Sequence, residues 1–86
     1  MPTVVMYSTQ ICPYCMRAEH LLKNRGVEHI EKIMVDLDSE KMHEMMQRTG
    51  RRTVPQVFIG DKHIGGFDDL SELDMEDELL PLLEAD

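Results

Sequence analysis

Short apolar runs alternate along this chain with longer segments of helical character. Residues 3–7 are apolar and rich in β-branched side chains, which predicts a buried strand. Pro13 suits the first position of a helix, where its missing N–H is not needed. Helix-forming residues continue from there to Asn24-Arg25-Gly26, which supplies a C-terminal stop. The chain is therefore predicted to begin with a strand and a helix.

The remaining pattern adds three strands and two helices. A second strand is predicted over about 28–35, and the segment 36–39 caps a helix over about 40–49 that ends at Gly50. Residues 56–59 and 62–65 form a hairpin around the Gly60-Asp61 turn. A last helix begins near Asp68-Asp69, and Pro81 either starts a further helical turn or ends this one.

The predicted order is βαβαββα, within one domain spanning residues 1–86. The first two strands, joined by a helix, should be parallel through a right-handed crossover, and the hairpin adds two antiparallel strands. The expected fold is α/β, a four-stranded mixed sheet flanked by helices on both faces.

Composition limits the core and the class of protein. Hydrophobic residues make up 42% of the chain, too many for a disordered segment, and there is no Trp. The core should be aliphatic and rich in Met, with Met42, Met45 and Met46 filling space beneath the second helix.

No apolar run approaches the roughly 20 residues of a membrane span, and no signal peptide is visible. A cytoplasmic location without membrane contact is expected.

The net charge of −8 is concentrated at one end of the chain. Residues 67–86 contain nine of the 17 acidic residues and no Lys or Arg. We interpret this segment as the solvated face of a terminal helix. Nucleic-acid binding is not expected, because no basic stripe is present to neutralise phosphates.

The two cysteines, Cys12 and Cys15, carry the candidate chemistry. Such a short loop is a poor staple for a fold, which favours redox chemistry over a structural disulfide. Cys12 falls at a predicted helix N-terminus, where unpaired N–H groups and the helix dipole favour a thiolate. Cys12 is therefore the candidate nucleophile, and the more buried Cys15 is the candidate resolving thiol.

Half of a zinc site is the alternative for a C-x-x-C pair. A structural zinc site needs two further ligands at matching spacing, and the four histidines (His20, His29, His43, His63) are scattered. No metal site is expected, and each histidine is interpreted as a surface residue.

Three motifs together resemble the glutaredoxin family. Cys12-Pro13-Tyr14-Cys15 is similar to the dithiol active site, Thr53-Val54-Pro55 to the loop opposite it, and the segment 65–70 to the glycine-glycine turn. They occur in the family's order and spacing, and the resemblance covers nearly the whole chain. It implies the thioredoxin fold and glutathione as co-substrate, with no tightly bound cofactor.

The resemblance also implies a glutathione site. Pro55 would be a cis-proline that leaves the Val54 backbone free to pair with the cysteinyl part of glutathione. The N–H groups of Phe67 and Asp68 would bind the γ-glutamyl carboxylate at a helix N-terminus, and Asp69 would pair with the ammonium. Asp68 and Asp69 could instead be plain helix caps. The complete set expected to bind glutathione is Tyr14, Arg51, Arg52, Thr53, Val54, Pro55, Phe67, Asp68 and Asp69, with either arginine facing the glycine carboxylate.

One position departs from the family pattern. Many glutaredoxins have a lysine three residues before the first cysteine, where this chain has Thr9. Stabilisation of the thiolate must then depend on the helix N-terminus and on backbone or threonine donors. Arg17 is a further cation, more than a turn into the helix.

The implied activity is reduction of protein–glutathione mixed disulfides and protein disulfides by a monomer. The partners are glutathione and glutathionylated or disulfide-containing proteins, with ribonucleotide reductase as one candidate client. Two alternatives remain open: a glutaredoxin-like protein reduced by thioredoxin reductase, and a dimer bridged by a [2Fe–2S] cluster on Cys12 and glutathione. The glutathione motifs disfavour the first alternative, and Pro13 and Cys15 disfavour the second.

Overall fold

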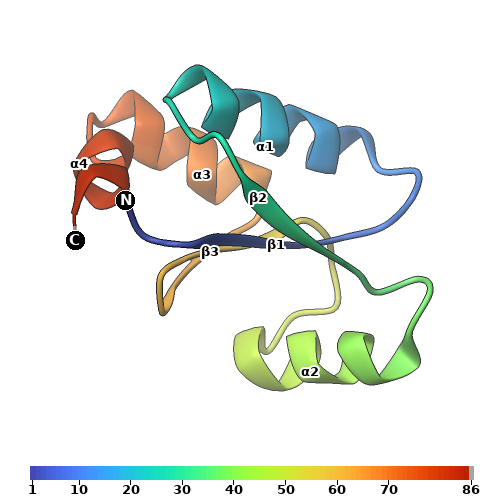
Figure 1. The fold of residues 1–86 in the computed structure, drawn as a ribbon. Helices are drawn as coiled ribbons and strands as arrows, with labels where there is room; N and C mark the ends of the chain where they lie inside the picture. Colours follow the sequence, from blue (N-terminus) through green and yellow to red (C-terminus); the bar gives the residue numbers. More distant parts are fainter. Residues whose placement is uncertain (86) are drawn as a thin grey trace.

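The computed structural model describes residues 1–85, which form one four-stranded sheet with helices on both faces (Figure 1). The strands are β1 (Val4–Ser8), β2 (Ile30–Met34), β3 (Gln56–Ile59) and β4 (Lys62–Gly65), in the spatial order β2-β1-β3-β4. β1 runs parallel to β2 and antiparallel to β3, and β3 runs antiparallel to β4. The predicted mixed sheet is confirmed.

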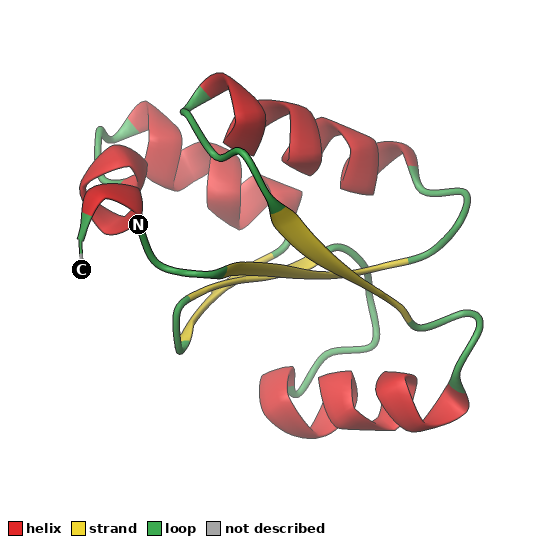
Figure 2. Cartoon of the chain, in the orientation of Figure 1, coloured by secondary structure: helices red, strands yellow, loops and turns green. Residues whose placement is uncertain are grey.

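The helices form a layer on each side of this sheet. α1 (Pro13–Asn24) and α3 (Phe67–Met75) pack side by side on one face, with the short α4 (Leu79–Glu84) at their end. α2 (Ser39–Thr49) lies alone on the other face (Figure 2). None of the helices within residues 1–85 is long and apolar enough to cross a membrane.

Local chemistry explains where the helices begin and end. The Asp38 carboxylate accepts the Glu40 N–H at 2.9 Å and caps α2, which ends at Gly50 in the left-handed conformation. α3 begins at Phe67, slightly earlier than predicted, because Gly66 is its N-cap. Pro81 lies in the first turn of α4, where backbone N–H groups have no intrahelical acceptor. Pro81 therefore belongs to a further helix.

The sheet separates two apolar clusters. The larger one, beneath α1, α3 and α4, is aliphatic and includes Met6, Ala18, Leu22 and Leu70. The smaller one, beneath α2, consists of Tyr7, Val35, Met45 and Phe58, with Met42 packed against it. Met45 is completely buried, which confirms its predicted role in the core. Met46 is only half-buried.

The acidic end of the chain is mostly exposed, as predicted, but one of its carboxylates has a structural role. The Asp74 carboxylate accepts two hydrogen bonds from the Arg25 guanidinium, at 2.6 and 2.7 Å. This pairing joins α3 to the C-terminal end of α1, and the hydrogen bonds from Arg25 lower the pKa of Asp74. The pair is a charge-assisted contact between α1 and α3.

Candidate active site

Cys12 and Cys15 form a disulfide at the start of α1. Cys12 is the N-cap residue, with extended backbone angles, and Pro13 occupies the first helical position as predicted. The Cα atoms of the two cysteines are 5.2 Å apart, within the usual range for a disulfide. Cys15 is 3% exposed and Cys12 is 9% exposed, so Cys15 is the more buried of the pair.

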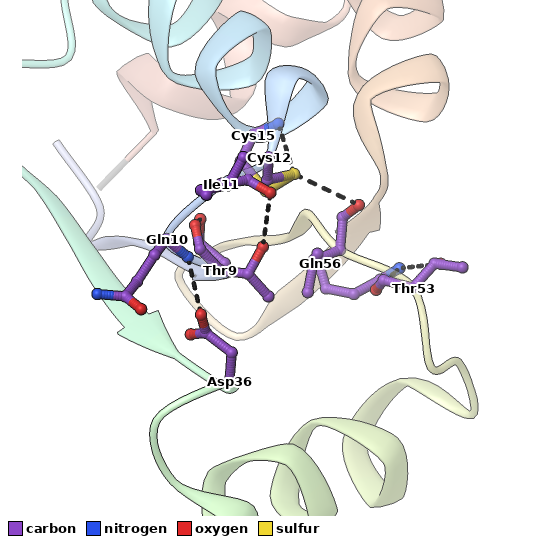
Figure 3. Close-up of a disulfide and its surroundings, with 10 residues drawn as sticks. Thr9, Gln10, Ile11, Cys12, Cys15, Asp36, Thr53 and Gln56 are labelled. Carbon is purple, nitrogen blue, oxygen red and sulfur yellow. Dashed lines mark hydrogen bonds between the residues drawn. A yellow bond between two sulfur atoms is a disulfide. The ribbon is translucent and has the colours of Figure 1, made fainter.

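The backbone of α1 directs a hydrogen-bond donor at the Cys12 sulfur. The Cys15 N–H points at Cys12 Sγ, with 3.1 Å between nitrogen and sulfur (Figure 3). In the reduced protein the same N–H, together with the helix dipole, would stabilise negative charge on this sulfur. The backbone donor that the sequence argument required is therefore present.

The loop before β3 faces the cysteine pair from the opposite side. The Val54–Pro55 peptide bond is cis, as the family resemblance implied. The Val54 carbonyl oxygen lies 3.9 Å from Cys12 Sγ. The loop therefore brings the backbone of Val54 next to the sulfur, although the two residues are 42 positions apart in the chain.

A groove of about 320 Å³ extends from this loop to the start of α3. Its walls contain eight of the nine residues expected to bind glutathione, and Gly66 in addition. Those eight residues are Tyr14, Arg51, Thr53, Val54, Pro55, Phe67, Asp68 and Asp69. The ninth, Arg52, is exposed and is not part of the lining.

Arg51 and Asp69 form an ion pair in the groove wall. Arg51 Nη1 donates to Asp69 Oδ2 at 2.8 Å, and the Gly66 N–H donates to the same oxygen at 2.9 Å. The hydrogen bond from Arg51, followed by that from Gly66, lowers the pKa of Asp69. Asp69 thus caps α3, which was the alternative interpretation of this residue. Both hydrogen bonds fall on Oδ2.

Gly65 makes room for this ion pair. Its backbone has a φ of +119°, which L-residues rarely adopt. A Cβ atom here would collide with the Asp69 carboxylate and come within 3.0 Å of Arg51 Nη1. Within the glycine-glycine turn, position 65 therefore favours glycine through both its backbone angle and the close approach of the two side chains.

The start of α3 forms one end of the groove. Phe67 and Asp68 are its first two residues, and the first N–H groups of a helix have no intrahelical acceptor. The Asp68 side chain is exposed. On the other side of the groove, the Tyr14 ring is 6.3 Å from that of Phe67. Tyr14, Phe67 and Asp68 therefore line the same groove.

The side chains of Thr9 and Arg17 interact with groups other than the Cys12 sulfur. The Thr9 hydroxyl donates to the Ile11 carbonyl at 3.5 Å, within its own loop (Figure 3). The Arg17 guanidinium lies over the Tyr14 ring, 5.2 Å from its centre. Arg17 therefore supports an aromatic wall of the groove, and the donor to the sulfur is the backbone N–H of Cys15.

Sequence reasoning missed two residues behind the groove, Gln56 and His63. Gln56 is completely buried and hydrogen-bonded to both Thr53 and His63. His20, His29 and His43 are exposed as expected, but His63 is half-buried, so the expectation of a surface position is wrong for His63. A glutamine within an otherwise apolar strand was the signal in the sequence that could have identified Gln56.

Within residues 1–85, no group of three or more His, Cys, Asp or Glu side chains is arranged to hold a metal ion.

A redox pair at a helix N-terminus, opposed by a cis-proline loop, defines a thiol–disulfide oxidoreductase site. The comparisons with known proteins specify the class further. The family model described as glutaredoxin matches residues 4–64. Glutaredoxin from Neisseria meningitidis serogroup A is 51% identical over 96% of this chain and 98% of its own length. Glutaredoxin 3 of Escherichia coli K12 is 47% identical over 96% of this chain and 99% of its own length.

Solved structures agree with these sequence relatives. The chain is similar to glutaredoxin from Brucella melitensis, with a TM-score of 0.85 and 43% identity over 98% of this chain and 90% of that one. It is also similar to the buckwheat glutaredoxin–glutathione complex, with a TM-score of 0.85 and 38% identity over 95% of this chain and 76% of that one. The chain belongs to the glutaredoxin family, and its fold is the thioredoxin fold. It is a thiol–disulfide oxidoreductase.

Proposed function

We propose that this glutaredoxin reduces protein–glutathione mixed disulfides and protein disulfides at the expense of glutathione, with Cys12 as nucleophile and Cys15 as resolving thiol. The observation that carries the proposal is the groove beside Cys12, whose walls combine a cis-proline loop, a helix N-terminus and the Arg51–Asp69 pair. The relative solved as a glutathione complex supports it.

Each part of glutathione has a complementary wall in this groove. Its cysteinyl backbone pairs with the peptide groups of Val54, which places its sulfur towards Cys12. Its γ-glutamyl carboxylate binds the N-terminus of α3 at Phe67 and Asp68. Its ammonium pairs with the Asp69 carboxylate, which lines the groove. Its glycine carboxylate faces Arg51.

With a glutathionylated protein, the Cys12 thiolate attacks the glutathione sulfur. The old disulfide bond breaks, the protein leaves as a thiolate, and Cys12 carries glutathione. A second glutathione thiolate then attacks this mixed disulfide and leaves with the first as glutathione disulfide. Cys12 is returned as a thiolate. The net reaction consumes one free glutathione and yields the reduced protein and glutathione disulfide, which contains the glutathione that the substrate carried.

With a protein disulfide, Cys12 attacks one sulfur and forms a mixed disulfide with the client. The Cys15 thiolate then attacks Cys12 Sγ, which releases the reduced client and forms the Cys12–Cys15 disulfide seen here. Two glutathione molecules reduce this disulfide again. We propose further that the protein works as a cytoplasmic monomer without a tightly bound cofactor, with ribonucleotide reductase among its candidate clients.

Supplying electrons from one source at a time tests the proposal. The protein is given a glutathionylated peptide with either glutathione, glutathione reductase and NADPH, or thioredoxin reductase and NADPH, and NADPH oxidation is followed. We expect turnover in the first mixture, none in the second, and none in either with Cys12→Ser. Turnover only with thioredoxin reductase would contradict the proposal.

A further inference from the structure

Gln56 is a polar side chain buried completely at the start of β3, directly after the cis-proline. Burial of an amide is costly unless its donors and acceptor are all used. Its Nε2 donates to the Thr53 carbonyl at 3.1 Å and to Thr53 Oγ1 at 3.3 Å (Figure 3). The amide therefore spans the cis-proline and holds the residue on its far side.

His63, on the neighbouring strand β4, fixes the orientation of this amide. Its Nε2 lies 2.7 Å from Gln56 Oε1. Because Gln56 Nε2 donates to Thr53, Oε1 must be an acceptor, and His63 must donate from Nε2. Both the neutral Nε2–H tautomer and the protonated imidazole can do this, so the bond survives titration of the ring.

The His63 ring is held in place by its surroundings. It packs against Phe58 with 5.0 Å between ring centres. Desolvation and then the positive charge of Arg51 lower its pKa, Arg48 acts in the same direction, and Asp69 opposes them. Lys62, Glu72 and Glu76 line the depression beside it.

We propose that Gln56, oriented by His63, is a positioning residue for glutathione: its amide holds Thr53 so that Val54 presents its peptide groups beside Cys12. This inference rests on the proposed function, because it concerns the same groove. Three observations support it: the amide is bonded on the groove side to Thr53, Thr53 and Val54 line the groove, and the Val54 carbonyl lies beside the reactive sulfur.

If Gln56 positions Thr53 for glutathione binding, Gln56→Met should raise the KM. This substitution keeps the length and burial of the side chain but removes its hydrogen-bond donors. Without them the Thr53 loop is no longer held, and the backbone pairing to the cysteinyl part of glutathione weakens. We expect the KM for a glutathionylated peptide to rise about tenfold, because a tenfold change in binding corresponds to the free energy of roughly one good hydrogen bond. The kcat at saturation and the alkylation rate of Cys12 at each pH should change less than about twofold.

Substitutions of His63 test the same chain of bonds at a site that is only half-buried. His63→Gln places an amide donor where the imidazole Nε2 stood, so its KM should remain that of the wild type. His63→Leu has no donor and should raise the KM in the same direction as Gln56→Met. This pair keeps the inference testable even if Gln56→Met does not fold.

Tyr7→Phe is the matched control. Tyr7 is also completely buried, is the cross-strand partner of Gln56, and donates to Glu44 at 2.5 Å, away from the groove. Loss of the Tyr7 hydroxyl should lower the melting temperature and leave the KM unchanged.

If the wild type is active and both Gln56→Met and His63→Leu have the same KM as the wild type, this inference alone is overturned. A wild type without glutathione-dependent turnover would overturn the proposed function as well.

Discussion

The Cys15 N–H points at the sulfur of Cys12 across 3.1 Å, so the resolving residue also supplies the nucleophile with a hydrogen-bond donor. The two residues lie within one turn at the start of α1. Helix N-termini generally favour the thiolate form of a cysteine. The backbone of α1 therefore offers a donor to a thiolate at Cys12.

Introducing a cation at position 9 should favour the thiolate form of Cys12. Thr9 lines the depression that also contains Cys12, and its hydroxyl is used within its own loop. In Thr9→Lys, the added positive charge should favour the Cys12 thiolate and raise the alkylation rate of the reduced protein below neutral pH, an effect weakened by salt. Alkylation rates of the reduced protein against pH measure it, with Thr9→Gln as the uncharged control. An unchanged alkylation rate in Thr9→Lys would show that position 9 has no influence on the sulfur.

Arg51 and Arg52 should differ sharply in their effect on glutathione. Arg51 lines the groove and pairs with Asp69, whereas Arg52 is exposed outside it. Arg51→Ala should raise the KM for a glutathionylated peptide by about tenfold, through loss of a charge-assisted bond to the glycine carboxylate. Arg52→Ala is the matched control and should change it less than about twofold. Equal effects of the two substitutions would contradict the assignment.

The Arg51–Asp69 pair also makes a small contribution to stability that depends on pH. The pKa of Asp69 is lowered from 3.8, so its contribution is fully present above pH 3.8 and is lost as pH falls through the lower folded pKa. Both side chains are more than 40% exposed, which limits the contribution to at most about 1 kcal/mol.

Denaturant unfolding of Asp69→Asn tests this pH dependence. The variant should be less stable than the wild type at pH 7, and the difference in the free energy of unfolding should shrink below pH 3.8. Asp68→Asn, at an exposed position beside it, is the control and should show no such trend. A difference that stayed constant down to pH 2 would show that the charge of Asp69 does not stabilise the fold.

Features fixed by local chemistry could be predicted from the sequence. The start of α1 at Pro13, the end of α2 at Gly50 and the hairpin around Gly60 each depend on one or two adjacent residues. The groove could be predicted only through the family motifs, because its walls come from three separate segments.

Contacts between distant side chains could not be predicted. Arg51 reaches Asp69 across 18 positions, and nothing local distinguishes Arg51 from Arg52. The bond from His63 to Gln56 depends on the antiparallel pairing of β3 and β4, and on a shift of register between Val57 and Phe58. Such bonds are set by the register and burial of the finished sheet, which composition and spacing do not encode.

The central claim is that Cys12 is the nucleophile and Cys15 the resolving thiol. It is tested most directly by the initial rate of glutathione-dependent reduction in two variants, Cys12→Ser and Cys15→Ser. A glutathionylated peptide and a protein disulfide serve as the two substrates. We predict that Cys12→Ser is inactive on both, and that Cys15→Ser retains the first activity and loses the second. Reduction of the glutathionylated peptide by Cys12→Ser would contradict the account. So would an equal loss of this activity in Cys12→Ser and Cys15→Ser.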